Sequence, residues 1–134
     1  MRRNEFRKCA REAGMQAPLE LAMPDAWSSD LGKYAEFLKG HDDIDCALMY
    51  SSNLSPYFYM ALRMAGLEPG EDVKIMAFNE TALARAVRPN LSVLLPDRAY
   101  LTSLILEGLE KLEAQPEADW KARCPMIAHL RESA

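Results

Sequence analysis

The sequence predicts an α/β fold, a doubly wound and mostly parallel sheet with helices on both faces. The first observation is that amphipathic helical segments alternate with short apolar segments along the whole chain, which is typical of this class. The second is a complete strand, helix, strand unit between Asp43 and Glu80. The third is that residues 44–50 are apolar on both faces, as in an interior parallel strand. With 134 residues, 49% of them hydrophobic and 27% charged, one compact domain is expected.

The first elements follow from periodicity and from breakers. Phe6 and Ala10 lie at helical spacing in residues 2–14, and Gly14 is placed to end that helix. Residues 18–23 alternate apolar and other side chains before Pro24, which predicts a strand. A loop with Trp27 follows, and then a helix over residues 31–39.

The second half of the chain continues the alternation. In the central unit, Ser55 caps a helix that starts at Pro56 and stops before Gly66. The remaining expected elements are strand 73–78, helix 81–86, strand 91–95, helix 97–113 and strand 126–130. The long helix carries one stripe of apolar side chains that must be buried, and these are Leu101, Leu104, Ile105, Leu109 and Leu112.

The helix after Ser55 has an apolar face too broad for one sheet. A chain of this size has little core left to cover a second face, so part of the helix is expected at a subunit contact in a homodimer. The side chains expected at that contact are Tyr57, Phe58, Met60 and Met64.

Charge and cysteine content narrow the class of protein. A net charge of −4 disfavours an extended surface for nucleic-acid phosphates. The three cysteines are an odd number without a C-x-x-C pair, and Cys9 and Cys46 are expected as small core residues in a reducing compartment. No apolar run approaches the ~20 residues of a membrane helix, and no signal-peptide core follows the start. A cytoplasmic location away from the membrane is therefore expected.

Motifs for catalysis, metals and cofactors fail on spacing. His41 and His129 are the only histidines and lack partners at metal-ligand spacing. The glycines form neither a Walker loop nor G-x-G-x-x-G, so no cofactor is expected. Ser51 and Ser52 follow a strand without the G-x-S-x-G of a hydrolase, and no catalytic residue is assigned. A small α/β hydrolase using one of these serines remains an alternative.

The carboxyl ends of the two central strands are followed by polar residues. Ser51, Ser52 and Asn53 follow the first strand, and Asn79 and Glu80 follow the second. Open α/β sheets bind ligands at these ends. The sequence therefore predicts a ligand site there, whose occupant it leaves open.

Several segments share their order and spacing with a known family. The start Arg2-Arg3-Asn4-Glu5-Phe6, with Gly14, is similar to an R-x-x-G-F helix, although Glu5 replaces the glycine. Gly66-Leu67, Glu71-Asp72-Val73 and Ala77-Phe78-Asn79-Glu80 follow the order G-L, E-D-V, G-[FY]-D-[DN]. The end, Leu130-Arg131-Glu132-Ser133, is similar to L-x-x-R-E-S. Together they resemble the effector-binding domain of the lactose and galactose repressor (LacI/GalR) family of bacterial transcription regulators.

The resemblance implies a role and an organisation. Residues 1–134 would be the carboxyl-terminal portion of the sensor domain, with the amino-terminal sensor subdomain and the helix-turn-helix domain absent from this chain. The protein would be a dimeric, non-enzymatic sensor of a small effector, and would contact DNA only through the missing head. Without its usual partner subdomain, helix 97–113 would fold back on its own subdomain, swap with a second copy or form a dimer contact. A periplasmic-type binding protein of a transport system is the alternative.

The resemblance also implies ligand-facing residues. Arg2 falls on the arginine that contacts effector, Trp27 lies where some members stack an aromatic ring, and Ser51, Ser52 and Asn79 would hydrogen-bond to the ligand. The family's Asn-Asp pair is Ser51-Ser52 here, and the aspartate that follows the family's aromatic residue is Asn79, so both of the family's acceptor carboxylates are absent. These neutral replacements leave the effector open between a sugar-like molecule, a less polar or anionic one, and none.

Overall fold

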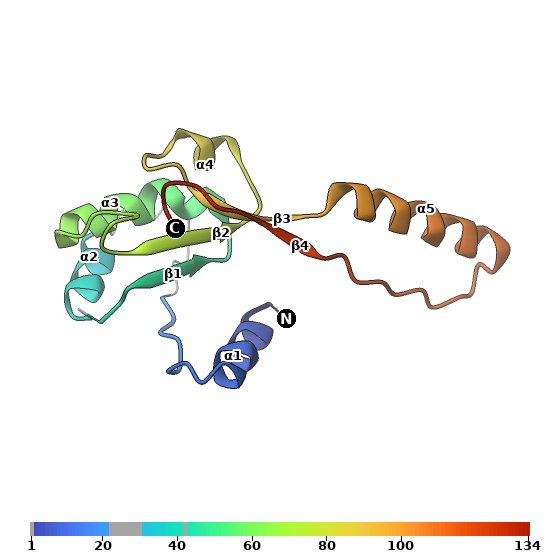
Figure 1. Ribbon diagram of the computed structural model, residues 1–134, viewed down its shortest axis with the longest axis horizontal. Helices are drawn as coiled ribbons and strands as arrows, with labels where there is room; N and C mark the ends of the chain where they lie inside the picture. Colours follow the sequence, from blue (N-terminus) through green and yellow to red (C-terminus); the bar gives the residue numbers. More distant parts are fainter. Residues whose placement is uncertain (1, 22–30, 42) are drawn as a thin grey trace.

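The computed structural model describes residues 2–21, 31–41 and 43–134. It has the predicted α/β architecture, a mostly parallel sheet with helices (Figure 1). Its elements are α1 (Arg2–Glu12), α2 (Leu31–Lys39), β1 (Cys46–Met49), the 3-10 turn η1 (Ser52–Leu54), α3 (Ser55–Ala65), β2 (Lys74–Phe78), α4 (Ala82–Ala86), β3 (Ser92–Pro96), α5 (Arg98–Ala114) and β4 (Met126–His129).

The four strands lie in the order β1-β2-β3-β4. β1, β2 and β3 are parallel, with Met49 opposite Ala77 and Phe78 opposite Leu94. The last strand is antiparallel to its neighbour and pairs His129 with Val93. α3 connects β1 to β2, and α4 connects β2 to β3, so each crossover between parallel strands contains a helix as expected.

Alternate residues of the strands build the core. Ile75, Ala77 and Val93 share one face of the sheet and are fully buried against α2 and α3. From α3, Tyr59 and Leu62 enter the same core. The opposite face is less covered, so its apolar side chains are only half-buried. These side chains are Leu48, Met76, Phe78 and Leu94. The prediction of an interior strand at residues 44–50 was therefore wrong for the described residues, because β1 lies at the edge of the sheet and only Met49 within it is buried.

Phe58 corrects the predicted subunit contact. It is 7% exposed and packs in the core, so its side chain is not available to a second subunit. Met60 and Met64 are about half exposed on another side of α3, and Tyr57 is half-buried. The helix reconciles these environments because residues 58, 59 and 62 fall on one face and residues 60 and 64 on another.

The structure departs from two further expectations. No strand forms at residues 18–21, where the alternating pattern predicted one, and residues 22–30, including Trp27, lie outside the described part. Cys9 and Cys46 are exposed, so the prediction that they are core residues was wrong. Cys46 is exposed because its side chain lies on the less covered face of β1. In the described residues no helix is long and apolar enough to cross a membrane.

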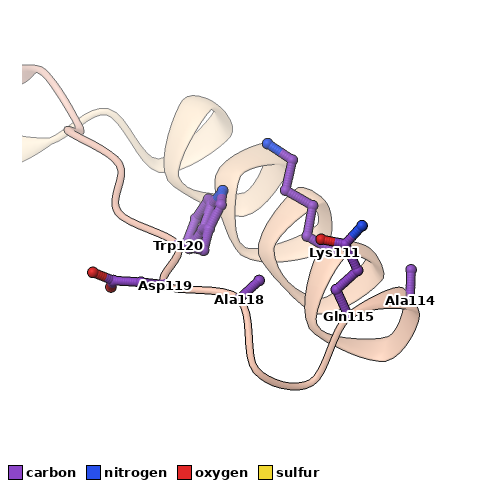
Figure 2. Close-up of a pocket in the computed structure, with 6 residues that line it drawn as sticks. All are labelled: Lys111, Ala114, Gln115, Ala118, Asp119 and Trp120. Atoms are coloured by element: carbon purple, nitrogen blue, oxygen red, sulfur yellow. The ribbon is translucent and has the colours of Figure 1, made fainter.

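The helix α5 extends away from the sheet, at the far end of the ribbon formed by β3 and β4 (Figure 1). We call α5 and the returning segment 115–125 the arm. Trp120 of the returning segment lies against the helix, where a Cβ on Gly108 would be 2.8 Å from the indole (Figure 2). The side chains of Leu106 and Leu109 remain 57% and 60% exposed. The helix has thus not folded back on its own subdomain.

The last four residues close the amino ends of β2 and β3. Ser133 is fully buried, and its carbonyl accepts the amide N–H of Ile75 at 2.5 Å. Its hydroxyl donates to the Ile75 carbonyl at 2.7 Å and accepts from the Ser92 amide at 2.8 Å. The chain passes so near Gly70 that a Cβ there would lie 2.7 Å from the Glu132 carbonyl oxygen. We call residues 131–134 the tail.

Candidate ligand-binding site

The carboxyl ends of β1, β2 and β3 meet at one edge of the sheet. Because these strands are parallel neighbours, the residues that follow them are brought together from three distant parts of the chain. Ser51 follows the first strand, Asn79 the second and Asp97 the third. We call this the carboxyl edge. It places two of the predicted ligand-facing residues, Ser51 and Asn79, on adjacent strands.

The two serines have different environments. Ser51 is half-buried and caps η1, accepting the Asn53 amide at 3.4 Å, a long hydrogen bond that leaves its hydroxyl available to a ligand. Ser52 is 1% exposed, its hydroxyl donates to Thr81 Oγ1 at 3.3 Å and its carbonyl accepts from the Ser55 hydroxyl at 2.8 Å. Ser52 therefore joins the two loops of the edge, and Ser51 is the better candidate for ligand contact.

Asn79 is exposed and has a positive φ of 64°. Asparagine is among the few residues other than glycine that adopt this conformation readily. Its main-chain N–H donates to the Leu94 carbonyl at 3.0 Å, which extends the pairing of β2 with β3 by one residue. The turn thus presents the carboxamide, a neutral donor and acceptor, at the carboxyl edge.

Glu80 lies next to this turn between two arginines. Its carboxylate accepts from Arg85 Nη2 at 2.7 Å and from Arg131 Nη2, and its side chain is only 11% exposed. The hydrogen bond from Arg85, then that from Arg131, holds the pKa of Glu80 below its ordinary value, although desolvation opposes this. These three residues and Asn90 line an open depression of about 460 Å³.

For the two remaining predicted site residues, Arg2 and Trp27, the structure describes no side-chain position. Arg2 begins α1, which lies apart from the sheet (Figure 1), and its side chain is outside the described atoms. Trp27 is likewise outside the described residues. Sequence reasoning did not assign roles to Glu80, Thr81 and Arg131. The Thr81 role had a local signal, a threonine placed to cap α4, whereas the Arg131 contact is 51 residues distant and had none.

The hydrogen bonds of the two serines bear on the hydrolase alternative. The Ser51 hydroxyl accepts the main-chain N–H of Asn53, and the Ser52 hydroxyl donates to Thr81 Oγ1. Neither of these contacts is with a base that would activate a nucleophile. His41 Nδ1 lies 2.8 Å from the Phe37 carbonyl, and its ring stacks on Phe37. Among the described residues, no group of three or more His, Cys, Asp and Glu side chains could hold a metal. A second cavity, of about 340 Å³, lies at the arm beside Trp120 (Figure 2).

Several solved structures that share this fold are transcription regulators. The Lac repressor bound to ONPG in the repressed state has 16% identity, with a TM-score of 0.77 over 99% of this chain and 40% of its own. A LacI-family regulator from an Arthrobacter species, in complex with lactose, has 21% identity and a TM-score of 0.69, over 94% of this chain and 48% of its own. The regulator CelR in complex with cellobiose has 19% identity and a TM-score of 0.68, over 96% and 40%.

At these identities the similarity establishes the fold. The chain spans less than half of each of these three regulators. No protein-family model matches the sequence, and no curated protein sequence is significantly similar to it.

Proposed function

We propose that this chain is the ligand-sensing part of a LacI-like transcription regulator and that it binds a small, neutral, hydroxyl-rich molecule at the carboxyl edge. The observation that carries the proposal is the position of Ser51 and Asn79 at the carboxyl ends of adjacent parallel strands, in a fold whose solved examples include complexes with cellobiose and lactose. Hydroxyl and carboxamide groups pair with sugar-like hydroxyls without requiring a charge on the ligand.

The proposal extends to the parts of the regulator outside these residues. The exposed apolar side chains of the arm need a partner surface, and a second sensor subdomain is the partner we propose. A helix-turn-helix domain beyond that subdomain would contact DNA, and ligand binding between the subdomains would alter the geometry of paired DNA-binding heads. Met60 and Met64, with Tyr57, remain the proposed dimer contact.

The ligand proposal is tested by thermal unfolding of the protein with cellobiose, lactose and ribose as separate probes. A ligand at about 100 times its Kd raises the free energy of unfolding by about 2.7 kcal/mol, which is several degrees in Tm. The shift should disappear in Ser51→Ala and in Asn79→Gly, which removes the carboxamide but keeps a residue that tolerates positive φ. Ser103→Ala, an exposed serine on α5, is the matched control.

A shift that survives both edge substitutions would place the ligand elsewhere, and the absence of a shift with all three sugars would remove these sugars as effectors. The DNA proposal has a separate test in the coding sequence directly upstream of the codon for Met1. An in-frame helix-turn-helix there supports regulation, and a secretion signal there would support transport instead.

A further inference from the structure

The tail reaches the carboxyl edge through one side chain, Arg131. Its main-chain N–H donates to Ser92 Oγ at 2.9 Å, and its guanidinium donates from Nη1 to the Leu91 carbonyl at 3.1 Å. The other guanidinium nitrogen, Nη2, pairs with Glu80. The arginine is therefore anchored on β3 at its base and holds a carboxylate beyond the end of β2 at its tip.

Glu80 lies between the two groups that shape the edge. Asn79, immediately before it, carries the positive φ of the turn, and Thr81, immediately after it, caps α4 by accepting the Ala84 amide at 3.3 Å. The same Thr81 oxygen accepts the Ser52 hydroxyl from the loop after β1. A displacement of Glu80 would thus move the contacts of both loops.

The carboxylate of Glu80 has two arginine partners, of which Arg131 is distant in the sequence and Arg85 is close. Arg85 belongs to α4, only five residues from Glu80, and its side chain is 69% exposed. Arg131 is 51 residues away and 31% exposed. An exposed, local ion pair contributes little, while a partly buried one across the fold constrains two separate segments.

We propose that Arg131 is a positioning residue for the candidate ligand-binding site: by holding Glu80, the docked tail sets the geometry of the Asn79–Thr81 turn and, through Thr81, of the loop at Ser51 and Ser52. The functional meaning of the edge rests on the proposed function, but the positioning itself does not need a ligand. The tail continues from β4 and the arm, so a short stretch of chain and the Arg131–Glu80 ion pair together connect the partner surface of the arm to the ligand site.

The test is residue-resolved hydrogen exchange on Arg131→Gln without ligand. We expect exchange to become about tenfold faster at the amides of Asn79, Ala84 and Leu54, whose acceptors belong to the edge. The amide of Leu67, which bonds to the Leu62 carbonyl at the far end of α3, should change by less than about twofold. Glu80→Gln should reproduce this pattern, and it serves as the second variant if Arg131→Gln does not fold.

Arg85→Gln is the matched control, because it removes the exposed arginine partner of the same carboxylate. It should change the exchange rates of the edge amides by less than about threefold. Unchanged edge amides in Arg131→Gln would overturn the proposal. Equal acceleration at Leu67 would overturn it as well, because the pair would then act on global stability alone. Failure of all sugar probes in the thermal test would leave this result standing, so the two proposals are separately refutable.

Discussion

The sheet region and the arm contain the same kinds of apolar side chain in opposite environments. Leu62 on α3 and Leu91 before β3 are fully buried, whereas Leu106 and Leu109 on α5 are more than half exposed. Both helices form because capping and helix-forming residues act locally. Burial differs because α3 has a sheet beside it and α5 extends away from that sheet (Figure 1). Helix formation is thus a local property of this chain, while burial depends on the partner surface available.

The largest expected effect tests the core side of this comparison. Leu62→Ala removes a fully buried side chain from the face of α3 that packs on β2, and should lower the free energy of unfolding by about 2 to 5 kcal/mol. Leu109→Ala, on the arm, should change it by less than about 0.5 kcal/mol. Urea unfolding followed by circular dichroism measures both. Similar losses in the two variants would show that α5 is buried in solution.

The next effect concerns the tail. Gly70→Ala places a Cβ 2.7 Å from the Glu132 carbonyl oxygen at a φ of +82°, so it should cost about 1 to 3 kcal/mol and loosen the tail. Gly66→Ala, with a φ of +84° and nothing within 4 Å of the new Cβ, is the control for backbone strain alone and should cost about 1 kcal/mol. Equal losses in the two variants would mean that the tail adapts to the extra methyl group.

Acid should weaken the Glu80 contacts. The pKa of Glu80 lies below its ordinary value, so its carboxylate contributes to folding above a pH of about 4.3, and the contribution is lost as pH falls through the folded-state pKa. Glu80→Gln should therefore lose about 1 to 2 kcal/mol at pH 7, and its difference in stability from the parent protein should shrink as pH falls below about 4.3. Urea unfolding of both proteins at pH 7, 5 and 3 provides the measurement. A constant difference across this range would show that the charge is not responsible.

The smallest effect on stability is expected in the arm. Leu106→Glu with Leu109→Glu replaces two exposed leucines, and should leave the free energy of unfolding within about 0.5 kcal/mol. If the arm binds a second protein surface or a second copy, the double variant should reduce association, as measured by light scattering during size-exclusion chromatography. Unchanged association would direct attention to the α3 face at Met60 and Met64.

Much of the fold was predictable because its signals are local. The helix stop at Gly66 and the cap at Asp97 lie within a turn of the elements they bound, and the apolar strands end at polar residues. The predicted cap at Ser55 was wrong, because Ser55 is the first residue of α3 and its hydroxyl donates to the Ser52 carbonyl. The failed strand at 18–21 had the right alternation, but a strand also needs a neighbour to pair with, which no local pattern contains. The exposed Cys46 was misjudged for a similar reason, since apolar neighbours in sequence do not show which face of a sheet is covered.

In the candidate site too, some features could be predicted from the sequence and others depend on tertiary contacts. Ser51 and Asn79 could be proposed from position alone, because residues after parallel strands meet at one edge. That Ser52 is buried as a link to Thr81, while Ser51 stays accessible, depends on the packing of two loops 29 residues apart.

By itself the sequence determined the class of fold, its succession of elements and the polar character of the carboxyl edge, since each depends on periodicity, caps or composition within a few residues. The tertiary structure decided which face of α3 is core, that Phe58 belongs to it, that the arm lacks a covering surface among the described residues, and that Arg131 holds Glu80. These last features depend on contacts between segments far apart in the chain, whose formation is governed by packing and chain topology and leaves no short-range pattern.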